Sequence, residues 1–478
     1  MSGAATLVDV HCHLFNAADI PVRGFARHVA LKNGFMSAQL AVIADRLTAG
    51  APGHAADLKR MDALFDGGPE FGSVASLEER VQEQVADAML ELTIEERRLI
   101  ADELAAVEPD TKPALGGSER FSAGSVTRFV AWAKLFSQSR VDLAVLYARQ
   151  FVPAAELAIP MLVDLASGVR DDAITGLEQQ VELFDRLSEA SMHGLLPGAP
   201  NLRLHPFVSF DPFRLIDGHR ASDGRPIREV IEDALLHRGF AGVKMYPEMG
   251  WRPSGNNAAG AGTAERAKRL NKVLDDFFGW CAENSVPITA HCNHSNYSDK
   301  AFEKAGNGAP SEWFPVLRSH PGLRVNLGHF GGAHEEEKYY SWAWDIASAM
   351  SEFPDRLFGD VGCHPTYAEK VMDTHFGVLR KMVDASPAVA RQLLFGTDWY
   401  MLAINPRAEG FTSTYRSRFR NEFGDGQADD FMGRNALRFL GFANPSDPSN
   451  ARLRKRYAEL GAARPAWLTA PDQESEDM

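Results

Sequence analysis

Histidine and aspartate residues follow short apolar segments at four separate places in the chain. His11 and His13 end the segment TLVDVHCH, His291 follows VPITA, and His329 follows LRVNLG. Asp398 follows LLFGT in the same way. Neutral imidazole and carboxylate are ligands that zinc and related divalent ions prefer in proteins. These five candidate residues therefore predict a metal centre, provided that the fold brings the four places together.

His11 and His13 are separated by one residue, which is the spacing of neighbours on one face of a β-strand. The two imidazoles are therefore expected to point the same way, with Cys12 on the other side. Two ligands on one rigid strand reduce the cost of ordering a metal site. A single histidine at a strand end is more often an ordinary core or surface residue, and the chain has 15 histidines. The prediction therefore rests on the recurrence of the pattern at all four places.

Eight short apolar segments predict the strands that position these residues. They cover residues 6–10, 141–147, 202–210, 240–245, 286–290, 323–327, 356–361 and 392–396. Helical patterns lie between them, and the clearest covers 264–284. This alternation predicts an α/β fold, a closed (β/α)8 TIM barrel, with an open doubly wound sheet as the alternative. Catalytic groups in such barrels gather at the carboxyl ends of the strands, where the five candidate residues lie.

Residues 16–140 are too many for one connection between a strand and a helix. Because they carry helical patterns, we interpret 16–140 as a long helical insertion after strand 1. It leaves strand 1 at the barrel mouth, so it is expected to be a cap that selects substrates or a surface for homodimer contacts. The barrel domain is expected to cover 1–445. Residues 446–478 form a C-terminal extension whose acidic end, PDQESEDM, is expected to be disordered.

The overall charge excludes several classes of partner. The 478 residues include 64 acidic and 50 basic side chains, and the formal net charge is −14. Such a chain repels nucleic-acid phosphates and anionic lipids, so we expect a small-molecule substrate, no nucleic acid and no membrane. The four cysteines form no C-x-x-C pair. The N-terminus does not have the pattern of a secretory signal, which favours a cytoplasmic protein.

Lys244 lies inside the apolar segment FAGVKMYP, where an uncompensated ammonium is costly. It is expected to form an ion pair with Glu248 or Asp360. Two alternatives are that it binds a substrate carboxylate, or that it is carbamylated and bridges two metal ions. Arg252, in the loop after the same segment, is a second candidate for a substrate carboxylate.

Two further sets of residues lie at or just beyond the predicted strand ends. Roles as outer hydrogen-bonding partners are open to His205, His294, His334, His364 and Asp360. Roles in an aromatic pocket wall are open to Tyr246, Trp251, Trp313, Trp399 and Tyr400, although each of these is more often plain packing.

These motifs resemble the amidohydrolase superfamily, specifically its amidohydrolase-2 branch, which includes aminocarboxymuconate semialdehyde decarboxylase and related decarboxylases and lactonases. VDVHCHLF is similar to the first-strand motif, and AGVKMYP, PITAHC, NLGHFGG and LLFGTDWY are similar to those of strands four, five, six and eight. FMGRNALRFLGF resembles the closing helix. The resemblance covers 1–15 and about 200–442, and it leaves 16–140 unexplained.

The resemblance implies one divalent ion, usually zinc, held by His11, His13, His291 and Asp398. His329 is then free for catalysis. In the binuclear branch, Lys244 would be carbamylated and His329 would join His291 on a second ion. Manganese is the alternative to zinc.

Two reactions fit this resemblance. Zinc lowers the pKa of a bound water to roughly 7, and Asp398 can then take its proton while His329 polarises the scissile carbonyl. This predicts a metal-dependent hydrolase acting on a C–N or C–O bond of an amide, lactone or cyclic imide. The alternative is a non-oxidative decarboxylase of an unsaturated or aromatic acid, and Arg252 is a candidate for holding its carboxylate. A catalytically silent barrel is a third interpretation, which the full ligand set disfavours.

Overall fold

Parallel β-strands form the centre of the computed structural model, which describes residues 6–20, 38–67, 74–107, 118–150, 152, 154–169, 173–293, 305–366 and 368–468. Every strand pair in these ranges is parallel, in the orders β1-β2-β3 and β4-β5-β6-β7-β8-β9. The strands are β1 (Leu7–Cys12), β2 (Ala155–Pro160), β3 (Arg203–Leu204), β4 (Phe207–Ser209), β5 (Gly242–Met245), β6 (Ile288–Asn293), β7 (Val325–Gly331), β8 (Leu357–Asp360) and β9 (Leu393–Leu394).

Two bridges join these strands into a closed ring. A parallel bridge between Met161 and Phe207 links β2 to β4, which continues the path of β3 after two residues. A second bridge pairs Cys12 with Trp399, and the amide of Val10 donates to Phe395 O over 3.1 Å. The last strand therefore lies beside the first. The fold is the predicted (β/α)8 barrel, because β3 and β4 together occupy one of its eight strand positions.

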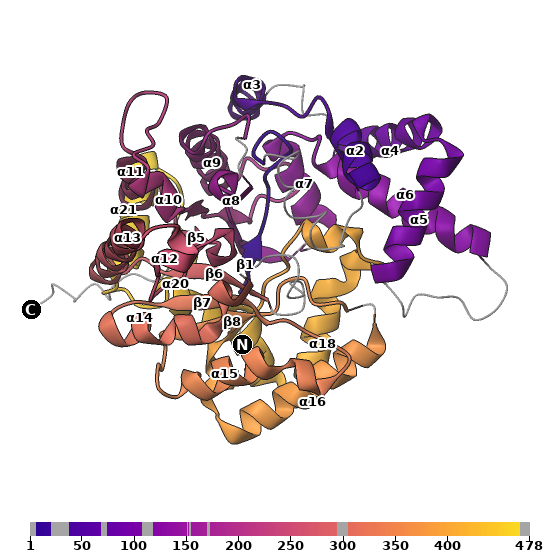
Figure 1. Ribbon diagram of the computed structural model, residues 1–478. Coiled ribbons are helices and arrows are strands. Elements are labelled where there is room, and N and C mark those ends of the chain that lie inside the picture. Colours follow the sequence, from indigo (N-terminus) through magenta and orange to yellow (C-terminus); the bar gives the residue numbers. More distant parts are fainter. Residues whose placement is uncertain are drawn as a thin grey trace, which may run out of the picture.

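In the described part of the chain, six helices lie between β1 and β2. They are α2 (Ala38–Thr48), α3 (His54–Phe65), α4 (Val74–Glu91), α5 (Ile94–Val107), α6 (Ser118–Leu135) and α7 (Arg140–Gln150). Figure 1 shows α2, α4, α5 and α6 together on one side of the barrel.

The second strand was predicted at the wrong place. Residues 141–147 belong to helix α7, and the strand is β2, eight residues after Tyr147. The segment VDLAVLY is buried along its whole length, so it shows no polar face at either the helical or the strand period. A short apolar segment of this kind cannot be assigned from periodicity alone.

The other main helices surround the barrel (Figure 1). They are α9 (Leu177–Met192), α11 (Ile227–His237), α13 (Ala264–Glu283), α15 (Ser341–Met350), α16 (Glu369–Ala385), α18 (Phe411–Phe423), α20 (Asn435–Leu440) and α21 (Pro448–Leu460). Helix α13 confirms the helix predicted at 264–284. Its N-cap Thr263 accepts a hydrogen bond from the amide of Arg266, and its apolar face, including Leu270, Leu274 and Phe277, is buried.

The C-terminal extension is packed against the barrel as far as the structure describes it. Four residues of the extension belong to the same buried cluster as Val8 and Val10 of β1. They are Leu453 and Tyr457 of α21, Trp467 and Leu468. The predicted disordered end, from 471 on, lies outside the described residues. In the described ranges no helix combines the length and the hydropathy that crossing a bilayer requires.

Candidate metal centre

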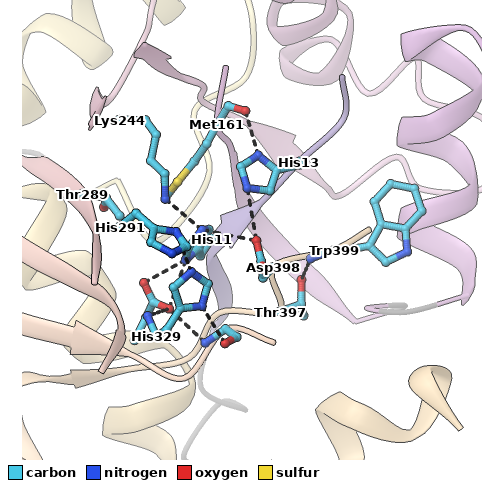
Figure 2. Close-up of polar contacts among 12 residues, drawn as sticks. His11, His13, Met161, Lys244, Thr289, His291, His329, Thr397, Asp398 and Trp399 are labelled. Carbon is cyan, nitrogen blue, oxygen red and sulfur yellow. Dashed lines mark hydrogen bonds and ion pairs between the residues drawn. The ribbon is translucent and has the colours of Figure 1, made fainter. Parts of the chain in front are cut away.

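His11, His13 and Asp398 come together at the carboxyl ends of β1 and β9. Asp398 Oδ1 lies 3.4 Å from His11 Nε2 and 3.1 Å from His13 Nε2. One ligand atom from each residue lies within 4.8 Å of the others. Figure 2 shows both rings directed at this carboxylate. Two imidazole nitrogens and one carboxylate oxygen are a donor set that fits a divalent ion such as zinc.

The far side of each imidazole ring is anchored. His11 Nδ1 lies 3.0 Å from the carboxylate of Asp360, and His13 Nδ1 lies 3.0 Å from Met161 O. Because these acceptors require a proton on Nδ1, both Nε2 atoms are left unprotonated toward Asp398 in the neutral rings. Burial lowers the pKa of His11 to about 4, so this ring is neutral at physiological pH. Proteins commonly orient metal-binding histidines in this way.

Asp360, at the end of β8, connects His11 with the segment that carries His329. Its Oδ1 accepts from the amide of His329 at 3.1 Å and from that of Gly362 at 2.9 Å, and its Oδ2 accepts from Asn326 Nδ2 at 2.7 Å. Burial acts to raise the pKa of Asp360, but the His11 ring and these donors outweigh it and hold the pKa well below its usual range. Asp360 is therefore an ionised, fully engaged carboxylate.

Asp398 is also ionised despite its burial. The neighbouring rings of His13 and His11 outweigh desolvation and hold the pKa of Asp398 well below its usual range. Its backbone has a φ of 54°, in the left-handed region that non-glycine residues rarely adopt, and its amide donates to His11 O over 2.6 Å. Such conformations persist only where the surroundings hold them.

His291 lies beside His329 rather than in the group formed by His11, His13 and Asp398. The distance from His291 Nδ1 to His329 Nε2 is 3.2 Å, and His291 Nε2 lies 4.0 Å from Glu248 Oε1. His329 Nδ1 donates to Gly362 O at 2.9 Å, and the His329 ring centroid lies 5.0 Å from that of His11. The five candidate residues thus lie in one cluster, with three of the four predicted metal ligands already at metal-binding separation.

Lys244 extends from β5 toward His11 (Figure 2). Its side chain is fully buried, and Nζ lies 3.1 Å from His11 Nε2 and 4.9 Å from the centre of the Tyr246 ring. The expected ion pair with Glu248 or Asp360 is not formed, because no carboxylate of the described residues lies within 4.0 Å of Nζ. Burial lowers the pKa of Lys244.

Glu248 is a second buried carboxyl group near this side of the centre, in the short helix η4 (Pro247–Met249). Its Oε2 has no hydrogen-bond partner among the described residues. Burial raises the pKa of Glu248 to about 8, so the carboxyl is mainly protonated at neutral pH.

Comparison with known proteins follows this geometry. Residues 214–442 match a family model described as Amidohydrolase, the amidohydrolase-2 model. These residues make up slightly less than half of the chain and are similar to the amidohydrolase superfamily. This similarity indicates an enzyme of the metal-dependent hydrolase or decarboxylase type, and the family implies a divalent metal ion. No curated protein sequence gives a significant match.

Several solved structures are similar to this chain at low sequence identity. An uncharacterised TIM-barrel protein from Bordetella bronchiseptica is 14% identical, with 62% of this chain and 80% of that chain covered and a TM-score of 0.37. An amidohydrolase from Burkholderia multivorans with bound zinc is 12% identical, with 65% and 92% covered and a TM-score of 0.39. Amidohydrolase 2 from Bifidobacterium longum subsp. infantis is 15% identical, with 63% and 85% covered and a TM-score of 0.32.

The other candidate residues of this chain lie outside the group formed by His11, His13 and Asp398. Arg252 is 45% exposed and is paired with Glu312 at 3.2 Å. His205 contacts Gly239 O and the hydroxyl of Tyr457 on α21, so it does not serve as an outer partner of the centre. His364 Nε2, in contrast, donates to His329 O at 2.9 Å.

The remaining predicted groups differ in their surroundings. His334 contacts the ring of Tyr339, which is partly exposed, and His294 lies outside the described residues. Tyr246 flanks His291, with ring centroids 6.0 Å apart. The indole of Trp399 extends away from Asp398 (Figure 2). The other aromatic candidates are buried: Trp251, Trp313 and Tyr400.

Three residues that contact the segments carrying the ligand candidates have no predicted role from the sequence. Asp9, Tyr147 and Thr397 are all fully buried and share hydrogen bonds. An aspartate two residues before His11 is the one signal that was available in the sequence, since buried carboxylates are rare unless they are bonded.

Proposed function

We propose that this protein is an amidohydrolase that hydrolyses a C–N or C–O bond of a small molecule of the amide, lactone or cyclic imide type. One zinc ion would be held by His11, His13, His291 and Asp398. The observation that carries the proposal is the convergence of two oriented Nε2 atoms on the Asp398 carboxylate. When bound, zinc would supply a Lewis acid and a water molecule that is acidic enough to react near neutral pH.

Asp398 suits the role of proton acceptor. It is ionised, and its low pKa reflects neighbours that are themselves metal-ligand candidates. In hydrolysis it would take a proton from the attacking water and pass it to the leaving group.

His329 is limited by its hydrogen bond to Gly362 O. Since Nδ1 must carry the proton that this carbonyl accepts, Nε2 of the neutral ring is an acceptor. His329 would therefore receive a proton as the neutral ring, and it would polarise a carbonyl oxygen only as imidazolium.

Metal analysis tests the proposal before any substrate is known. The purified protein is expected to bind about one zinc per chain, and the His11→Ala/His13→Ala double variant is expected to bind none. His334→Ala, which removes a histidine outside the centre, is the control and should retain the metal. A wild-type protein that takes up neither zinc nor manganese contradicts the proposal. A panel of amides, lactones and aromatic acids, assayed separately for hydrolysis products and for carbon dioxide, then identifies the reaction.

One observation favours a second reaction, the non-oxidative decarboxylation of an unsaturated or aromatic acid. Lys244 places a buried amino group 3.1 Å from His11 Nε2, with no described carboxylate within 4.0 Å. A substrate carboxylate would compensate such a charge. Carbon dioxide release by the wild type, and a higher KM for acids in Lys244→Met, support this alternative. Two zinc ions per chain would instead support a carbamylated Lys244 in a binuclear centre.

We also propose that the insertion over 16–140 forms a cap that takes part in substrate selection. Phe136, just after α6, packs against Phe15 and Tyr400 with ring centroids 6.1 and 4.5 Å away. The Phe15 ring in turn lies 5.2 Å from that of His13. The end of α6 is thus connected to a metal-ligand candidate through two aromatic rings.

A further inference from the structure

A single buried carboxylate, that of Asp9 on β1, contacts both segments that carry the ligand candidates of the β1–β9 pair. Asp9 Oδ1 accepts from the amide of His11 at 3.1 Å and from the amide of Thr397 at 3.0 Å. Asp9 Oδ2 accepts from the hydroxyl of Thr397 at 2.7 Å. One side chain therefore joins two segments that are 388 residues apart in the sequence.

The same carboxylate also orders the residue on the far side of Asp398. The Thr397 hydroxyl donates its proton to Asp9 and accepts a hydrogen bond from the amide of Trp399 at 3.0 Å. Both neighbours of Asp398 are therefore connected to Asp9. Asp398 itself holds the left-handed backbone conformation, which has to be maintained by its surroundings.

Tyr147 brings a contribution from outside the strands. Its hydroxyl, on helix α7, donates to Asp9 Oδ2 at 2.8 Å, and its ring lies 5.4 Å from that of Trp399. Asp9 thus accepts four hydrogen bonds, all from uncharged donors. Tyr147 supplies the one that does not come from β1 or from the segment 397–399.

Asp9 is not the only link that closes the barrel at this place. Backbone bonds from Val10 to Phe395 O and from Thr397 to His11 O, each 3.1 Å long, already join β1 to the segment after β9. What the carboxylate adds is the orientation of the turn at 397–399, and with it the direction of the Asp398 side chain.

We infer that Asp9 and Tyr147 are positioning residues for Asp398, acting through both backbone neighbours of that ligand candidate. The inference rests on the proposed metal centre and deepens it. Neither residue touches the reacting atoms. They hold the carboxylate where it and two imidazole nitrogens can bind one ion. Their loss should therefore lower the affinity for the metal, with a smaller effect on the thermal stability of the protein.

Tyr147→Phe is the mildest test, and Tyr457→Phe is its matched control. Both tyrosines are buried, and Tyr457 donates its hydroxyl to His205 at 3.2 Å, away from the ligand candidates. We expect Tyr147→Phe to weaken zinc binding by about 10-fold, at the lower end of effects seen for outer hydrogen-bonding partners, in competition with a chromophoric chelator. Tyr457→Phe should match it in thermal stability and retain wild-type zinc affinity.

Thr397 offers a second test with a conservative rescue. Thr397→Val removes the hydroxyl that bonds both Asp9 and Trp399, whereas Thr397→Ser keeps it. With cobalt in place of zinc, Thr397→Val should change the visible ligand-field spectrum, and Thr397→Ser should restore the wild-type spectrum. This readout depends on the geometry of the centre and not on turnover.

The outcomes separate this inference from the proposed function. If the wild type binds zinc but Tyr147→Phe and Thr397→Val keep its affinity and cobalt spectrum, the positioning role is overturned and the metal centre stands. If the wild type binds neither zinc nor cobalt, the metal centre is overturned, and the inference falls with it. A zinc affinity lowered equally in Tyr147→Phe and Tyr457→Phe would also overturn it, since the effect would then be one of general stability.

Discussion

The two sides of the metal centre are held in different ways. On the β1–β9 side, the rings of His11 and His13 are anchored at Nδ1, and Asp398 is held through both of its neighbours. On the β5–β6 side, Lys244 has no described carboxylate partner, and Glu248 Oε2 has no partner in the described part of the chain. Rigid ligands keep a metal ion in place, whereas incompletely partnered buried groups are suited to a substrate or a second ion. We therefore expect the first side to retain the metal ion and the second side to adapt to a substrate or a second ion.

The largest effect should come from loosening the rigid side. Asp360→Asn keeps the shape of the side chain but removes the charge that anchors His11 Nδ1. We expect zinc affinity to fall by about 10- to 100-fold, as is typical when an outer partner of a metal-binding histidine is lost. Chelator competition measures it. An affinity unchanged in Asp360→Asn would mean that the anchoring of His11 does not matter for metal retention.

A smaller effect, on stability, is expected from crowding His11 at its Cβ. A Cβ on Gly396 would lie 2.8 Å from His11 Cβ, so Gly396→Ala must displace one of the two segments. Overpacking of this kind costs about 1–3 kcal/mol, which urea unfolding of the metal-free protein can measure. Gly377→Ala is the control, because Gly377 lies at an exposed position of α16 where its Cβ would meet nothing within 4 Å, and alanine is the better helix former by about 1 kcal/mol. Equal stability changes in the two variants would contradict the tight packing of His11.

The smallest effect on metal binding should come from the adaptable side. Glu248→Gln keeps a neutral group in place of a carboxyl that is mainly protonated at neutral pH, so zinc affinity should stay close to that of the wild type.

The same variant changes how stability depends on pH. Burial raises the pKa of Glu248 from 4.5 to about 8, so the native state binds the proton more tightly than the unfolded state does. The stability that this group contributes is fully present below pH 4.5 and is lost as the pH rises through 8. Between pH 5 and 8, the wild type should lose on the order of a few kcal/mol more than Glu248→Gln in urea unfolding of the metal-free protein. Parallel pH dependences would show that Glu248 is not protonated in the native state.

Sequence reasoning reached the barrel because most of its strands are short apolar segments that end in polar residues. It failed at the second strand, where VDLAVLY lies in α7 and is buried along its whole length. Burial on every side removes the periodicity that separates a helix from a strand. The true strand, AELAIP, carries a glutamate and a proline, neither of which is typical of strands.

The candidate ligands could be selected from sequence because they lie at or just after the ends of four strands, β1, β6, β7 and β9. Their supporting contacts could not. The bonds from Asp9 to Thr397 and from Asp360 to His11 join residues 388 and 349 positions apart, and no local pattern encodes such pairs. The ion pair of Lys244 was predicted wrongly for the same reason. Its Nζ lies beside His11 Nε2, and His11 is 233 residues away in the sequence.

The place where β1 meets β9 has a consequence for how the protein matures. His11 and His13 leave the ribosome well before Asp398, because Asp398 lies much later in the chain. Because the donor atoms meet across the junction that closes the ring, a nascent or truncated chain ending before this junction has no complete set of donors to capture an ion. We therefore expect metal loading only in chains in which β1 and β9 are already paired.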